Sequence, residues 1–122
     1  MISGRVNDRY EPKIPLSVAG PTGKSHRITA LNDTGYSGFL TLPRAIIDLL
    51  DLEWQTTVWG TLANGSMIVF DVYSAIVDWD GSFRIVQLEA AESGPLVGMR
   101  LSAGHRVVAE ITPDGTVDIQ PL

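Results

Sequence analysis

Residues 28–43 read ITALNDTGYSGFLTLP, and this stretch decides the fold that the sequence predicts. An apolar run ends in Asp33-Thr34-Gly35, and a helix candidate opens shortly afterwards at Pro43. Asp and Gly are favoured in turns for local reasons, so the tripeptide is first of all a turn. A carboxylate at a strand end, among backbone N–H groups, is also well placed to act on a scissile carbonyl. The tripeptide alone leaves both interpretations open.

Runs of β-prone residues surround this stretch and predict an all-β domain. The runs cover residues 13–18, 25–31, 56–62, 67–79, 83–92, 105–111 and 116–120. The run 67–79 is long and apolar on both predicted faces, and Asn64-Gly65 before it is the strongest short hairpin signal because both residues tolerate positive φ.

Two short helices are expected among the strands. Residues 43–50 are the better candidate, since Pro43 suits a first helical turn and residues 46, 47 and 50 share one face. Residues 99–103 could form the second, closed by Gly104. We therefore expect one small domain, residues 1–122, with a closed or nearly closed β architecture.

Composition excludes several classes of function. The 122 residues are 44% hydrophobic and 19% charged, which is typical of a folded domain with a core. The net charge of −5, without a basic run, argues against nucleic acid as a partner. Cysteine is absent, so no disulfide is possible. No signal peptide or membrane-length apolar run is evident, so we expect a soluble, cytoplasmic protein with no membrane partner.

Two motif-like fragments and the two histidines do not support other chemistry. Residues 20–25 end in the Gly-Lys-Ser of a phosphate-binding loop, but Val18 replaces the required Gly and the following residues predict a strand. Ser37 is not in a nucleophile elbow, because Phe39 stands where that motif needs Gly. His26 and His105 have no carboxylate at ligand spacing, and we interpret them as surface or edge-strand residues.

The order of parts resembles the retropepsin group of aspartic proteases, in particular the small bacterial retropepsin-like proteins. The turn at 33–35 is one anchor, and residues 95–101, PLVGMRL, are the second and more discriminating one. In the family, an apolar pair plus Gly precedes a short helix in the second half of the fold. The resemblance covers nearly the whole chain and implies the acid protease fold, a retropepsin-like closed β-barrel with one or two short helices.

An aspartic endopeptidase without cofactor or metal is the activity that the resemblance implies. Asp33 would be the catalytic acid and base, Thr34 would bond across the subunit contact, and Gly35 would let backbone approach the carboxylate. Two carboxylates about 3 Å apart cannot both ionise, so one keeps a proton while the other activates water. The chain has one Asp-Thr-Gly and no Asp at 96–98, so a homodimer must supply the second carboxylate.

The Asn64-Gly65 hairpin falls where the family has its flap. Ala63, Asn64, Gly65 and Ser66 would then form the tip that closes over a peptide or protein substrate, although a plain hairpin remains open as an alternative. Residues 96–98 are expected to pack in the core beneath the active-site turn. Residues 116–122 are expected either to form an interface strand or to close the sheet of their own subunit.

Two residues depart from the family pattern. Asn32 stands just before Asp33, where an aliphatic residue is usual, and a buried amide there needs hydrogen-bond partners. Tyr36 replaces a common Ser or Ala, and its ring cannot steady the carboxylate as a Ser hydroxyl does. Two functions therefore remain open: an active dimeric peptidase, and a catalytically silent retropepsin-like domain that binds peptides or partners.

Overall fold

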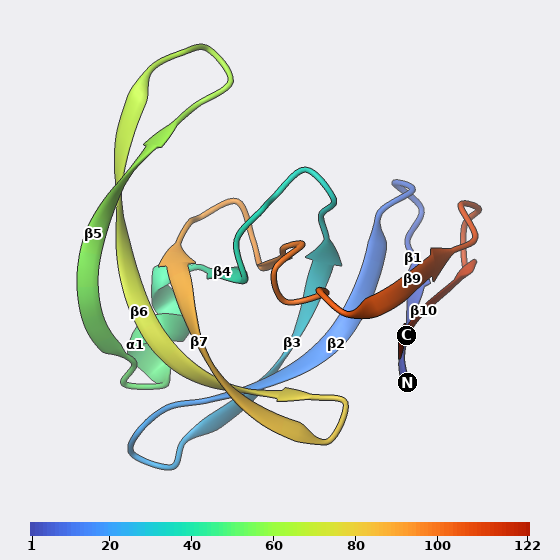
Figure 1. The fold of residues 1–122 in the computed structure, drawn as a ribbon, viewed down its shortest axis with the longest axis horizontal. Helices are drawn as coiled ribbons and strands as arrows, with labels where there is room; N and C mark the ends of the chain where they lie inside the picture. Colours follow the sequence, from blue (N-terminus) through green and yellow to red (C-terminus); the bar gives the residue numbers. More distant parts are fainter.

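Ten strands and one short helix make up the computed structural model, which describes all of residues 1–122 (Figure 1). In chain order they are β1 (Ile2–Val6), β2 (Pro12–Ala19), β3 (Ser25–Asn32), β4 (Leu40–Leu42), α1 (Arg44–Leu49), β5 (Glu53–Thr61), β6 (Met67–Trp79), β7 (Ser82–Ala90), β8 (Leu96–Val97), β9 (His105–Ala109) and β10 (Thr116–Pro121). The all-β prediction is confirmed, and each predicted strand run has its counterpart within a few residues.

A single sheet contains all ten strands, in the order β5-β6-β7-β4-β8-β3-β2-β1-β10-β9. An additional antiparallel pairing joins β6 to β2, where Val18 lies opposite Val77. This pairing links β2, β3, β8, β4, β7 and β6 into a ring. Two pairings in the ring, β3 with β8 and β4 with β7, are parallel, and the sequence pattern did not predict β1, β4 or β8.

The buried apolar side chains form one cluster of 22 residues. On β2 the alternate residues Ile14, Leu16 and Val18 are buried, as the period-two pattern predicts. Fully burying a side chain of this size contributes about 1.5–3 kcal/mol to stability. The alternation therefore sets which face of each strand turns inward.

The predicted helix at 43–50 is present as α1, and the predicted helix at 99–103 is wrong. Pro43 lies just before α1 as its N-cap, with extended backbone, and Ile47 and Leu50 are buried as expected. Residues 99–103 form turns instead. The amides of Leu101 and Ser102 both reach the Gly98 carbonyl, at 3.2 and 3.3 Å, which closes one turn before the chain enters β9. One turn that is not continued by a series of i→i+4 backbone hydrogen bonds is not a helix.

The hairpin of β5 and β6 rises from the rest of the molecule as a long curved arm (Figure 1). The inner half of β6 alternates between buried and partly exposed residues, whereas Met67, Ile68 and Val69 in its outer half are exposed. The prediction of a strand that is apolar on both faces was correct in composition. The outer half is nevertheless exposed, because the arm extends beyond the layer that would cover it.

Both chain termini lie at the opposite end of the molecule, where β10 lies between β1 and β9 (Figure 1). Ile119 pairs with Ile2 on one side and with Val107 on the other. Both edges of β10 are thus occupied within its own chain. Of the two alternatives for residues 116–122, the structure supports closure of the chain's own sheet.

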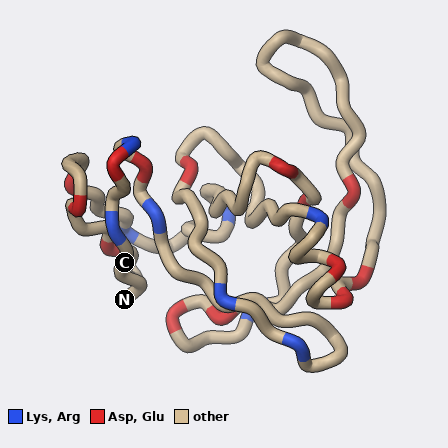
Figure 2. Tube along the Cα trace, turned by 180° about the vertical axis from the view of Figure 1, so that it is seen from behind, with Lys and Arg blue, Asp and Glu red and all other residues tan.

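Charged residues are spread over the trace without a basic face (Figure 2). The outer part of the arm is uncharged, because no Asp, Glu, Lys or Arg occurs between Glu53 and Asp71. The one helix, α1, has six residues, and no helix here has the length and apolarity needed to span a bilayer.

Candidate functional site

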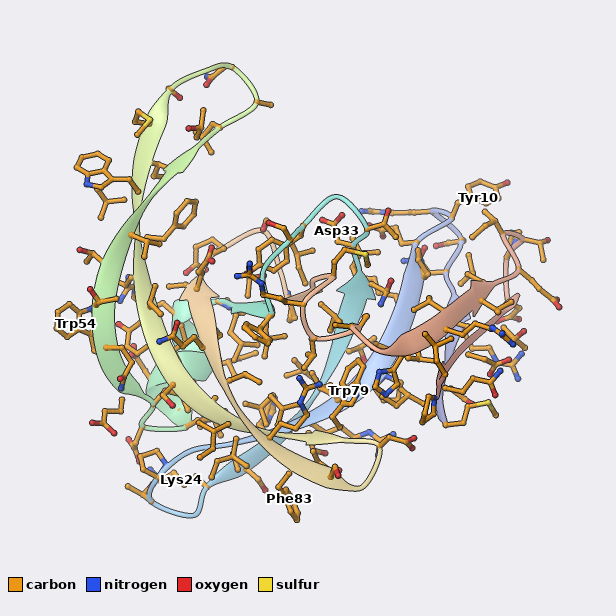
Figure 3. All side chains as sticks on the ribbon, in the orientation of Figure 1. Tyr10, Lys24, Asp33, Trp54, Trp79 and Phe83 are labelled. Carbon is orange, nitrogen blue, oxygen red and sulfur yellow. The ribbon has the colours of Figure 1, made fainter.

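Asp33 is the first residue after β3 and begins the loop above that strand (Figure 3). Its amide donates to the Val97 carbonyl at 2.9 Å, and its half-buried carboxylate accepts a 2.9 Å hydrogen bond from the Gly35 amide. The Tyr36 amide closes the turn by donating to the Asp33 carbonyl at 3.2 Å. The predicted turn is therefore confirmed, with the side chain of Asp33 bonded to backbone two residues ahead. Thr34 and Gly35 are exposed.

The second anchor, residues 95–101, lies directly against this loop. Leu96 and Val97 form β8, which pairs with the end of β3, and Gly98 donates its amide to the Phe39 carbonyl at 3.0 Å. A Cβ at Gly98 would lie 2.0 Å from the carbonyl oxygen of Gly38. The two segments approach so closely that only glycine fits, as expected for packing beneath the turn.

Tyr36 is half-buried in the same loop, and its hydroxyl donates to the Leu40 carbonyl at 3.3 Å. Burial raises the pKa of the Tyr36 phenol, and the nearby Glu89 carboxylate raises it further through its charge and a hydrogen bond. The phenol therefore stays protonated throughout the neutral range. As expected from its position, its hydroxyl makes no hydrogen bond to the Asp33 carboxylate.

Asn32 is buried, and its side-chain amide has a hydrogen-bond partner. Its side-chain amide donates to the Ser102 hydroxyl at 3.4 Å, and no buried side-chain polar atom of the structure lacks a hydrogen bond. This long contact joins β3 to the turn that follows β8. The sequence offered no signal for this pairing, because the two residues are 70 positions apart.

The tip of the arm is a well-defined turn. The Leu62 amide donates to the Ser66 carbonyl at 2.8 Å, and the Gly65 amide donates to the Leu62 carbonyl at 2.9 Å. Gly65 has a φ of 86°, but Asn64 keeps negative φ and instead accepts hydrogen bonds from Ser66 through its side chain. The hairpin prediction is confirmed, with positive φ at Gly65 and not at Asn64. All four tip residues, including Ala63, are exposed.

Below the tip, the stem of the arm exposes large apolar side chains. Trp59 is 70% exposed and Met67 is 60% exposed, and Val58, Leu62, Ile68 and Val69 are exposed as well. Val58 and Ile68 lie on one face of the hairpin, and Trp59, Met67 and Val69 lie on the other, so the stem is apolar on both faces.

A cleft of about 550 Å³ opens between this stem and the loop that follows Asp33. Its lining combines residues of the loop, the arm and the ring of strands: Tyr36, Ser37, Gly38, Thr41, Val58, Trp59, Gly60, Thr61, Leu62, Phe70, Glu89, Ala91, Ser93, Leu96 and Arg100. None of the predicted site residues lines this cleft. Asp33, Thr34, Gly35 and residues 63–66 all lie outside its lining. The cleft begins at Tyr36, directly beyond the Asp-Thr-Gly turn.

A polar cluster secures the base of the arm. The Arg44 guanidinium lies 2.7 Å from the Asp71 carboxylate and donates to the Tyr73 hydroxyl at 3.0 Å, and the Trp54 indole donates to Asp71 at 3.2 Å. The Arg44 guanidinium, followed by the Trp54 N–H, lowers the pKa of Asp71. The cluster joins α1, β5 and β6. Trp54 appears at the base of the arm in Figure 3.

Sequence reasoning missed the stem of the arm and Glu89 as walls of the cleft. The absence of charge from residues 54 to 70 was a usable signal for the stem, since a solvated strand pair normally carries charged residues. Nothing in the local pattern identified Glu89.

His26 is exposed at the start of β3, and His105 on β9 lies against a buried tryptophan. The Trp79 indole donates to Nε2 of His105 at 3.2 Å. An indole N–H can only donate, so Nε2 is the acceptor and Nδ1 carries the proton. No group of three or more His, Cys, Asp or Glu side chains comes together as metal ligands would.

Comparisons of the chain with protein-family models, with curated proteins and with solved structures each find no match.

Proposed function

We propose that this protein is an aspartic endopeptidase of the retropepsin-like type, in which Asp33 of two identical chains forms the catalytic dyad. One observation carries the proposal: a half-buried carboxylate stands at the end of β3, in a turn held against β8, directly beside a cleft under a long hairpin arm. The ring of strands and the stacking of the 95–101 segment on the loop support a retropepsin-like closed barrel.

The chemistry follows from pairing two such turns across a two-fold axis. Two carboxylates held about 3 Å apart share a proton, and the ionised member removes a proton from water while the protonated member polarises the scissile carbonyl. The pair titrates as a unit. Thr34 is exposed next to Asp33, so its hydroxyl is free to bond to a partner turn.

The arm supplies the binding surface for an extended peptide. β5 is an end strand of the sheet, so one of its edges has no backbone partner. A peptide can hydrogen-bond to such an edge while its side chains enter the adjoining cleft. Closure of the arm over the substrate would also remove water from around the reacting carbonyl.

The decisive experiment is cleavage of a mixed peptide pool from about pH 3 to pH 8, the range in which a carboxylate dyad titrates. Asp33→Asn should reduce cleavage to background, because the neutral amide cannot serve as the base. Its Tm should change little, since the side-chain oxygen can still accept the Gly35 amide. Asp8→Asn, at an exposed position, is the matched control and should remain active. Equal activity of wild type and Asp33→Asn at every pH would overturn the mechanism.

A catalytically silent peptide-binding domain is the second candidate. One observation favours it: within the chain, the Asp33 carboxylate has a single hydrogen-bond partner, the Gly35 amide. Wild-type protein that binds peptides of the pool but cleaves none of them across the pH range would select this function over the first.

A further inference from the structure

We propose that Glu89 selects peptides that carry a lysine or arginine side chain, which would enter the cleft between the arm and the Asp33 loop. This inference rests on the proposed function, because it names the substrate class of the same site. Glu89 lies outside both the Asp-Thr-Gly turn and the hairpin tip.

The position of Glu89 follows from the register of β7. Leu88 and Glu89 are consecutive, so they face opposite sides of the strand, and Leu88 is fully buried in the core. Glu89 pairs with Val72 on β6 and with Thr41 on β4, one residue before the end of β7. Its side chain is half-buried there and lines the 550 Å³ cleft.

The Glu89 carboxylate has no cationic partner within the chain. The three ion pairs of the structure, those of the N-terminus with Asp80, Lys24 with Asp51 and Arg44 with Asp71, all lie elsewhere. Arg100 lines the same cleft but is exposed and does not come within 4.0 Å of Glu89. A half-buried carboxylate without a cationic partner gains from a cation that arrives with a ligand.

The walls around Glu89 suit the whole of a basic side chain. Phe70 and Tyr36 bring aromatic rings to the cleft, and Val58 and Leu96 add aliphatic surface. Lysine and arginine have an apolar stem that packs on such walls and a charged head that a carboxylate binds. Aromatic faces also attract the cation directly. The cleft therefore offers a carboxylate and apolar walls together.

The test compares peptide pairs that differ at one position, with lysine in one peptide and norleucine in the other. We expect wild type to cleave the lysine peptides about tenfold better at low salt, with the preference shrinking as salt is raised. Glu89→Gln should cleave both members of a pair equally. Glu110→Gln makes the same change in net charge at an exposed site outside the cleft and should keep the preference.

Binding to Asp33→Asn, measured by fluorescence anisotropy with the same peptides, separates this inference from the peptidase proposal. Tighter binding of the lysine peptides, lost in Asp33→Asn/Glu89→Gln, supports the role of Glu89 even if wild type cleaves nothing. The inference is overturned if chains that keep Glu89 show no preference for lysine. In that case wild type cleaves both peptides of a pair equally well, or Asp33→Asn binds both equally tightly. The salt dependence of wild type needs no variant, so the inference stays testable even if Glu89→Gln fails to fold.

Discussion

At the scale of single residues, the site depends on how closely two backbones can approach. Gly98 contacts Gly38 at a distance that leaves no room for a methyl group, and the amides of Met99 and Arg100 donate to Tyr36 and Gly38 carbonyls at 2.8 and 3.1 Å. The loop that carries Asp33 is held by these bonds. A glycine at this place is needed for contact rather than for a special φ, because its φ is not positive.

Gly98→Ala should therefore cost more stability than an ordinary glycine replacement. We expect a loss of about 2–3 kcal/mol, since the new methyl group meets backbone that must move. Chemical denaturation measures the loss. The control is Gly23→Ala, where the φ of 88° is strained for alanine but no atom lies within 4 Å of the new Cβ. We expect about 1 kcal/mol there, and an equal cost at both positions would contradict the close contact.

At the scale of elements, the arm is stabilised at its base and left apolar along its stem. The cluster of Arg44, Asp71, Trp54 and Tyr73 ties the first part of the hairpin to α1, while the outer strands pair only with each other. A two-stranded ribbon without a covering layer is only marginally stable. The cluster therefore fixes the arm to α1 only at its base.

This cluster predicts a dependence of stability on pH. Asp71 has a lowered pKa in the folded protein, chiefly through Arg44. Its contribution is therefore present above the unfolded pKa of about 3.9 and disappears as pH falls through the lower folded value. Asp71→Asn should lower the Tm at pH 7, and this difference from wild type should vanish at about pH 2. A Tm difference that is the same at both pH values would show that the ion pair is not its source.

At the scale of the whole molecule, the proposed activity requires two chains. Each chain brings one Asp-Thr-Gly, and β8, which lies next to β3, has no carboxylate to complete a dyad. Because β10 is already paired on both sides, it has no free edge to offer a partner chain. The unpaired edges of the sheet belong to β5 and β9. The apolar stem of the arm is a further surface that a second chain or a substrate can cover.

Specific activity should fall on dilution below the dimer dissociation constant, by mass action. Sedimentation at the same concentrations should show the dimer giving way to monomer. Thr34→Val removes an exposed hydroxyl next to Asp33 and should shift both curves to higher concentration without lowering the stability of the monomer. A monomer with full activity that does not depend on concentration would exclude a site shared between chains.

The local structure of this protein follows from short stretches of its sequence. Alternation on residues 14–18 set the buried face of β2, Asn64-Gly65 set a hairpin turn with positive φ at Gly65, and Asp33-Thr34-Gly35 set a turn after a strand. These features depend on neighbours within a few positions, so a short window of sequence is enough to predict them. The same local logic failed at 99–103, where the helix signal was too short to outweigh the tertiary contacts of Gly98.

Which segments meet depends on packing between distant parts of the chain. Three short strands, β1, β4 and β8, exist because longer neighbours pair with them, and the partner of Asn32 lies 70 residues away. The same is true of Glu89, which reaches the cleft through its register with β4 and β6. Strand pairing and register are long-range choices made by packing one whole face against another, and no window of the sequence contains both partners.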